Sequence, residues 1–205
     1  PAAPPDPELV KLLSERIGYV YPYPSREIKT TVTGMVGEEE KSAAQSIADD
    51  DAIMQMGTAY HAIMQKIDFS APFGQEYERL KDMFTDEISV PQIKAAHENV
   101  ARILGDFGGK VYREQSFVVD FDGTLVQGII DLMAVNGKRA LILDYKLSGE
   151  KNLLSDKYVG QINAYADAVE KVLKIKVERL ILYSFTSKVA KKVERRPSES
   201  KKTAF

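Results

Sequence analysis

The chain has 205 residues, enough for one domain with a substantial core, and its hydrophobic content of 44% and charged content of 28% are ordinary for a globular protein. A net charge of −2 gives no overall positive field that would attract nucleic acid. The absence of cysteine excludes disulfides, thiolate zinc sites, cysteine catalysis and cysteine-ligated iron–sulfur clusters. No apolar run approaches about 18 residues and no signal peptide is visible, so we expect a cytoplasmic protein without membrane contact.

Residues 1–25 are rich in proline and tyrosine, and we interpret them as a lead-in to the domain. Apolar residues at helical spacing predict four helices before the middle of the chain, at about 8–17, 51–66, 73–88 and 91–105. Asp51 is the expected N-cap of the second of these.

A β-meander is expected over residues 111–147 because β-branched and apolar residues alternate there between turn signals. The pattern then predicts a helix and two strands, at about 156–173, 179–185 and 189–194. The polar, basic residues 195–205 are expected to form a disordered tail, so the expected domain spans residues 26–194. The sequence thus predicts an α/β domain with a mixed, mostly antiparallel central sheet flanked by helices.

The dipeptide Asn136-Gly137 lies between two apolar runs of the meander. It favours a two-residue hairpin loop in which both central residues have positive φ. With these two residues at the centre of the turn, Asp131 lies opposite Ile142. Asp144 is then a diagonal neighbour of Asp131 on the same face of the sheet.

The dipeptide Asp122-Gly123 predicts a second tight turn. Counting back from this turn places Glu114 directly opposite Asp131, and Lys146 projects from the same face. The opposite face is expected to join the core, through the apolar residues Ile130, Leu132, Leu141, Leu143, Tyr145 and Leu147.

Asp131 and Asp144 interrupt apolar strands, where a charge without a function is costly. Carboxylate oxygens are the ligands that Mg²⁺ prefers, and the Tyr145 carbonyl is a further candidate ligand. Lys146 is placed to orient a water, favour hydroxide or stabilise developing phosphorane charge, and Glu114 to serve a second metal or a metal-bound water. These residues predict metal-dependent hydrolysis, most naturally of a phosphodiester. The alternative is that acid–lysine pairs form on exposed strands without any function.

His61 follows Gly57 by one helical turn, and Gln65 continues the same face. Taken alone, a single histidine on a helix is more often structural than a metal ligand. Gln161 and Tyr165 are neighbours at i and i+4 on the last helix, and by themselves they carry no functional signal.

Five motifs occur in an order that is specific as a set: Gly-Thr-Ala-Tyr-His at 57–61, Arg-Glu-Gln-Ser-Phe at 113–117, Gln-Gly-Ile-Ile-Asp at 127–131, Asp-Tyr-Lys at 144–146 and Gln-Ile-Asn-Ala-Tyr at 161–165. Together they resemble the C-terminal nuclease domain of AddA/RecB-type helicase–nucleases, in the PD-(D/E)XK superfamily. The resemblance covers roughly residues 20–190 and implies a restriction-endonuclease-like core. One departure is Leu147-Ser148, where the family usually has Thr and often Asp after the lysine.

The resemblance implies a role for each motif residue. The metal ligands would be His61, Asp131, Asp144 and the Tyr145 carbonyl, the catalytic lysine would be Lys146, the auxiliary acid would be Glu114, and the residues that position the site and DNA would be Gln161 and Tyr165. The resemblance therefore favours a metal-ligand role for His61 over a structural role.

It also implies a cofactor and partners. The expected cofactor is Mg²⁺, with Mn²⁺ able to substitute. No iron–sulfur cluster is expected, which resembles the nuclease domain of AddA rather than that of AddB. The expected substrate is DNA, fed by a helicase motor in the same polypeptide or complex, with a second helicase–nuclease subunit, in double-strand-break repair by recombination. Two alternatives stay open: a free-standing phage-type or CRISPR-associated exonuclease, and a non-catalytic DNA-binding scaffold domain.

Overall fold

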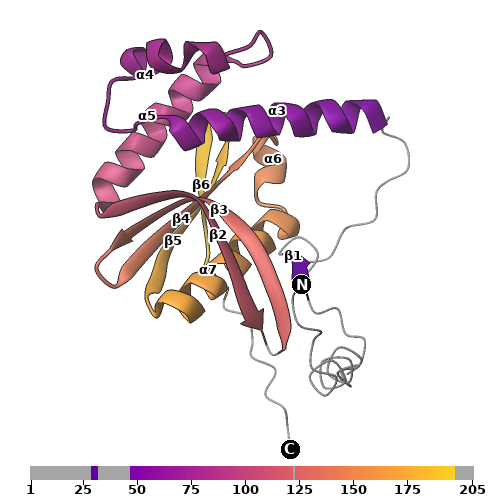
Figure 1. Cartoon of the computed structure of the whole chain (residues 1–205), viewed down its shortest axis with the longest axis vertical. Helices are drawn as coiled ribbons and strands as arrows, with labels where there is room; N and C mark the ends of the chain where they lie inside the picture. Colours follow the sequence, from indigo (N-terminus) through magenta and orange to yellow (C-terminus); the bar gives the residue numbers. More distant parts are fainter. Residues whose placement is uncertain (1–28, 32–46, 122, 197–205) are drawn as a thin grey trace, which may run out of the picture.

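The computed structural model describes residues 29–31, 47–121 and 123–196 (Figure 1). Its elements are, in chain order, β1 (Lys29–Thr31), α3 (Ile47–Lys66), α4 (Phe73–Leu80), the 3₁₀ turn η1 (Lys81–Met83), α5 (Val90–Phe107), β2 (Lys110–Phe121), β3 (Thr124–Asn136), β4 (Arg139–Lys146), α6 (Glu150–Leu153), α7 (Asp156–Leu173), β5 (Lys176–Ser184) and β6 (Val189–Val193). The expected lead-in and the helix at about 8–17 lie outside the described residues. In the described part of the chain, no helix is both long and apolar enough to cross a membrane.

The six strands form one mixed sheet in the order β1-β3-β4-β5-β6, with β2 pairing along the other edge of β3. The β2–β3, β3–β4 and β5–β6 pairs are antiparallel, whereas β1–β3 and β4–β5 are parallel. The long strand β3 pairs with β1 near its start and with β4 near its end. The expected α/β fold with a mostly antiparallel mixed sheet is confirmed.

Helices cover both faces of the central strands (Figure 1). Residues of α3 and α5 form a core with one face of β3, β4 and β5, and residues of α7 form a second core with the other face. Side chains of strand β4 alternate between the two cores: Leu141 and Leu143 belong to the first, and Ala140 and Ile142 belong to the second. A strand buried on both faces carries a continuous apolar run, so an acid within it is conspicuous.

Two helix predictions were wrong in their bounds. Helix α3 begins at Ile47, so Asp51 lies within the helix rather than at its N-cap. Helix α4 ends at Leu80, and residues 84–89 run outside regular helix, whereas one helix was expected over 73–88. Tertiary contacts hold this segment: the Ser89 N–H donates to the hydroxyl of buried Tyr60 at 2.9 Å.

The β3–β4 turn lies one residue later than predicted. Asn136 pairs with Arg139, so the central residues are Gly137 and Lys138, and Gly137 has a φ of 61°. The Asn136 side chain donates to the Phe107 carbonyl at the end of α5 at 2.9 Å, which holds Asn136 in the strand. The shift moves every cross-strand partner by two residues, and an even shift keeps each side chain on its predicted face.

The β2–β3 register is as predicted. Phe121 pairs with Thr124, and Gln115 pairs with Ile130. Glu114 has a φ of 46°, a left-handed conformation that is uncommon for a residue other than glycine. Around this point the side-chain alternation changes: Ile130 is buried in the α7 core, whereas Leu132, two residues later, is buried in the other core. The expectation that these two share a face was wrong.

The start of the expected tail is anchored to the domain. Arg195 pairs with Asp167 and Glu170 on α7, and the Arg196 N–H donates to Asn163 at 2.6 Å. Residues 197–205, the rest of the predicted tail, lie outside the described residues.

Candidate metal centre

Three candidate ligands from three elements meet at one point: His61 of α3, Glu114 of β2 and Asp131 of β3. One ligand atom from each lies within 4.8 Å of the others. The His61 Nδ1 atom is 3.3 Å from Asp131 Oδ1 and 4.0 Å from Glu114 Oε1. The exposed fractions of these side chains are 31% for His61, 26% for Glu114 and 9% for Asp131, so the cluster is open on the side of the first two. We call these three residues the candidate metal centre.

Burial of α3 places His61 at this point. The neighbouring residues Tyr60, Ile63 and Met64 are fully buried in the core between α3 and the sheet. His61 is left at the margin of that buried stripe, and its ring meets Tyr145 edge-on with centroids 5.8 Å apart. An amphipathic helix face, rather than any feature of the histidine itself, therefore decides where the imidazole lies.

Asp131 is held by the neighbouring strand. Its Oδ2 atom accepts a hydrogen bond of 2.7 Å from the backbone N–H of Tyr145. One carboxylate oxygen is thus fixed against β4 while the other faces His61.

Asp144 and Lys146 form a buried ion pair beside the candidate metal centre. The Lys146 Nζ atom is 2.6 Å from Asp144 Oδ2, and the two side chains are 15% and 3% exposed. Among the described residues, Asp144 Oδ2 has no hydrogen-bond partner of good geometry. Continuing the β3–β4 register by one residue places Asp131 opposite Asp144, so both carboxylates share a face.

The structure therefore brings Glu114 into the ligand cluster and leaves Asp144 in the ion pair with Lys146. The sequence resemblance implies the reverse roles for these two acids, with Asp144 as a metal ligand and Glu114 as an auxiliary acid. Both acids lie close enough to Asp131 for its charge to raise their pKa values.

Burial and mutual repulsion disfavour negative charge throughout this site. Burial, followed by the charge of Asp131, raises the pKa of Glu114. Burial also raises the pKa of Asp144, against the opposing effect of Lys146. Burial lowers the pKa of His61, but the hydrogen bond and charge of Asp131 outweigh it, so the net shift is upward. Asp144 likewise outweighs burial and raises the pKa of Lys146.

These properties fit a divalent cation. Three carboxylates and one imidazole gather where burial makes negative charge unfavourable. A bound cation would relieve this condition, and oxygen-rich sites select hard cations such as Mg²⁺ and Mn²⁺.

Gln161 and Tyr165 lie together on α7, as their spacing predicts. Gln161 Nε2 donates to the Tyr165 hydroxyl at 2.9 Å. Burial, then the charges of Asp144 and Asp131, raises the pKa of Tyr165, so its phenol stays neutral and keeps its proton.

The sequence-based interpretation missed two residues next to the site. At Gly128, an added Cβ would lie 2.7 Å from Phe117 and 3.1 Å from Tyr165, so any side chain there would force these rings to move. Tyr158 lies under Lys146, whose Nζ is 5.0 Å from the ring centroid. The spacing in the sequence could have indicated Tyr158, because with Gln161 and Tyr165 it forms an i, i+3, i+7 series on one helix face.

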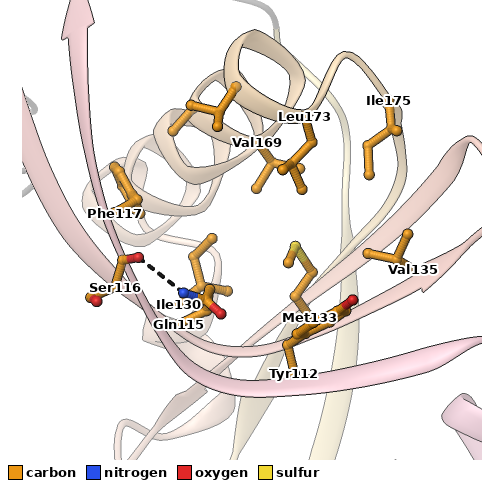
Figure 2. Close-up of a pocket in the computed structure, with 12 residues that line it drawn as sticks. Tyr112, Gln115, Ser116, Phe117, Ile130, Met133, Val135, Val169, Leu173 and Ile175 are labelled. Atoms are coloured by element: carbon orange, nitrogen blue, oxygen red, sulfur yellow. Dashed lines mark hydrogen bonds between the residues drawn. The ribbon is translucent and has the colours of Figure 1, made fainter.

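A separate apolar cavity of about 470 Å³ lies between the β2–β3 hairpin and the second half of α7 (Figure 2). Figure 2 shows Tyr112 and Met133 of the strands on one side and Val169 and Leu173 of α7 on the other. None of the described residues that line it is an acid, a histidine or a lysine, so it lacks the kinds of group that form the candidate metal centre.

The sequence profile of the PD-(D/E)XK nuclease superfamily matches residues 36–204. An ATP-dependent helicase/nuclease subunit from Pelotomaculum thermopropionicum is 32% identical over 162 residues, which cover 64% of this chain and 13% of that protein. A protein of the same name from Desulforamulus reducens is 27% identical, over 89% of this chain and 19% of that protein. The chain thus spans less than a fifth of the length of either relative.

Among solved structures, a putative exonuclease from Eubacterium rectale superposes with a TM-score of 0.38 and 13% identity, covering 77% of this chain and 61% of that one. The sequence comparisons decide the family. The chain belongs to the PD-(D/E)XK nuclease superfamily and is homologous to the nuclease region of AddA helicase/nuclease subunits.

Proposed function

We propose that this chain is a metal-dependent deoxyribonuclease that hydrolyses DNA phosphodiester bonds with Mg²⁺, for which Mn²⁺ can substitute. The observation that carries the proposal is the convergence of His61, Glu114 and Asp131 within 4.8 Å, beside the buried Asp144–Lys146 pair. Acids and an imidazole that can bind a cation, next to a lysine, are groups that can support in-line hydrolysis of a phosphodiester.

The cation would be held by His61, Asp131, Asp144 and the Tyr145 carbonyl. When bound, it supplies positive charge that polarises the phosphate and lowers the pKa of a coordinated water. Glu114 would serve as an auxiliary acid, because its carboxylate already lies beside Asp131 and His61.

Lys146 would act at the reacting phosphate. Its side chain is 15% exposed, so the ammonium can meet substrate while Asp144 and Tyr158 restrain it. There it would orient the attacking water and stabilise the negative charge that grows on the phosphorane oxygens. Tyr165, aligned by Gln161, keeps its proton and would donate a hydrogen bond that positions the site and the DNA.

The names of the relatives support a biological setting. Both are named as ATP-dependent helicase/nuclease subunits, and the chain covers only 13% to 19% of their lengths. The 205 residues contain no Gly-x₄-Gly-Lys-Ser/Thr phosphate-binding pattern. We infer that a helicase motor in the same polypeptide or complex feeds DNA to this domain, alongside a second helicase–nuclease subunit. The corresponding process is exonucleolytic processing of double-strand breaks in recombinational repair.

The test compares cleavage of end-labelled single-stranded and double-stranded DNA by the parent chain, by Asp144→Asn and by Asp106→Asn. Asp106 is the matched control, because it pairs with Arg179 on the surface and its side chain is 67% exposed. We expect cleavage by the parent and by Asp106→Asn in Mg²⁺ or Mn²⁺, none in EDTA, and a loss of at least ~100-fold in Asp144→Asn.

Binding of Mn²⁺, measured by titration calorimetry without DNA, supplies a second readout. The parent should bind Mn²⁺ and Asp131→Asn should bind it at least ~10-fold more weakly. Full cleavage by Asp144→Asn or in EDTA would refute the metal-dependent mechanism. DNA binding without cleavage by any form, in either metal, would favour the non-catalytic scaffold.

A further inference from the structure

We propose that Tyr158 is a positioning residue for Lys146, an inference that rests on the proposed nuclease function. Tyr158 lies in the first turn of α7, and the Lys146 Nζ atom is 5.0 Å from the centre of its ring. An ammonium over the face of a tyrosine ring is attracted by the electron density of that face.

Lys146 needs such restraint because its stem is long and flexible. A lysine side chain has four rotatable bonds, and fixing them costs conformational entropy. Two contacts from different elements limit Lys146: Asp144 on its own strand at 2.6 Å, and Tyr158 on α7. Together they hold the ammonium on the face of the sheet from which both Asp144 and Asp131 project.

The two contacts respond differently to a bound cation. Asp144 Oδ2 is both the partner of Lys146 and a candidate ligand, so a divalent cation would compete with Lys146 for it. The cation would also repel the ammonium directly. The face of a tyrosine ring is not a ligand for a hard cation, so the Tyr158 contact would persist where the Asp144 contact weakened.

Tyr158 is itself well fixed. The adjacent Val159 and the nearby Ile162 are buried in the core between α7 and the sheet. Tyr158 shares a helix face with Gln161 and Tyr165, one and two turns further on. One face of α7 thus supplies a ring for the lysine and a phenol for the site.

The test uses Tyr158→Phe, which keeps the ring, and Tyr158→Leu, which removes it. Phe121→Leu is the control, since Lys171 Nζ also lies 5.0 Å from the Phe121 ring centre, at the far end of β2. We expect Tyr158→Leu to lower kcat by ~3- to 30-fold with little change in KM, and Tyr158→Phe and Phe121→Leu to stay near the parent. Equal losses in the Phe and Leu variants, or a rise in KM with kcat unchanged, would overturn the proposal in favour of a direct Tyr158–DNA contact.

A readout in metal-free protein separates this inference from the proposed function. In a proton–carbon NMR spectrum, the ring current of Tyr158 should shift the Lys146 ε-methylene signal upfield of the lysines that lie over no aromatic ring, as Tyr112 and Phe121 should do for Lys110 and Lys171. The signal that disappears in Lys146→Met identifies Lys146. The upfield shift should survive in Tyr158→Phe and vanish in Tyr158→Leu. An active enzyme without the shift would overturn the role of Tyr158, whereas the shift in a chain that cleaves no DNA would refute the nuclease and leave the Tyr158–Lys146 contact standing.

Discussion

The backbone N–H of Tyr145 donates its hydrogen bond to the side chain of Asp131, at 2.7 Å. The last described backbone pair of these strands is Leu132 with Leu143, so beyond it a carboxylate takes the place of a backbone acceptor. The strand that carries Asp144 and Lys146 thereby fixes the orientation of Asp131.

Replacing Asp131 should separate this structural bond from cation binding. Asp131→Asn keeps an oxygen for the Tyr145 N–H, so we expect the free energy of unfolding to change by less than about 1 kcal/mol. Asp131→Ala leaves that N–H without an acceptor and should cost about 1–3 kcal/mol. Both variants should lose DNA cleavage. Urea denaturation and a cleavage assay give the two readouts, and equal stability of the two variants would contradict the bond's structural role.

The Asp144–Lys146 pair should show strong coupling in a double-mutant cycle. Lys146→Met leaves a buried carboxylate without a partner, and we expect it to cost about 3 kcal/mol of unfolding free energy at pH 8. Asp144→Asn combined with Lys146→Met should recover much of that loss, because neither position of the pair then carries a buried charge. Mg²⁺ should also stabilise Lys146→Met by replacing the missing positive charge. Additive effects of the two single substitutions, measured by urea denaturation, would exclude the coupling.

The contribution of Glu114, Asp144 and His61 to the stability of the metal-free protein should fall as pH rises from acid to neutral. Glu114, Asp144 and His61 all have folded-state pKa values raised above their ordinary values. A raised pKa means that the folded state binds the proton more tightly, so this contribution is full below the ordinary pKa and is lost as pH passes the folded pKa. For Glu114 the loss begins near its ordinary value of 4.5, and for His61 near 6.5. Saturating Mg²⁺ should flatten the profile, and an unchanged slope would show that no cation binds these groups.

Glu114 carries both an unfavourable charge and an unfavourable backbone conformation, with a φ of 46°. Glu114→Gln removes the charge alone and should stabilise the metal-free protein at pH 7 by about 0.5 kcal/mol, with no gain at pH 4. Glu114→Gly also relieves the left-handed conformation and should add about 1 kcal/mol at both pH values. Thermal denaturation at the two pH values distinguishes the effects, and a Gly variant less stable than the Gln variant would argue against strain. Both variants should cleave DNA more slowly than the parent.

Gly128 and Gly57 form a matched pair of motif glycines. Gly128→Ala would press a methyl group against Phe117 and Tyr165, and should cost about 1–3 kcal/mol and reduce cleavage by displacing the Tyr165 phenol. Gly57→Ala would place its Cβ an ordinary 3.8 Å from Leu147, in a helix, and should stabilise the protein by about 0.5–1 kcal/mol. Urea denaturation with a cleavage assay compares them. Equal effects of the two substitutions would contradict the steric role of Gly128.

Much of the fold could be predicted because local signals agree with it. Periods of 3.6 and 2 placed most helices and strands of the described part, but β1 and α6 were not predicted and the bounds of α3 and α4 were wrong. The turn after Phe121 gave the correct partner for each residue of β2 that is paired, which is every one but Glu114. The β3–β4 turn was misplaced by one residue, because the bond from Asn136 to the Phe107 carbonyl of α5 cannot be read from neighbours in sequence.

The sequence by itself determined the chemistry available to this protein: Asp131 and Asp144 interrupt apolar strands, Lys146 follows two residues later, and an even register error cannot change the face from which they project. Only the tertiary structure decided how these groups divide. It set His61 beside Asp131 and its predicted neighbour Glu114, and it left Asp144 with Lys146 over the Tyr158 ring. The reason is physical: spacing along one element fixes the direction of a side chain, but the distance between elements depends on how their apolar faces pack.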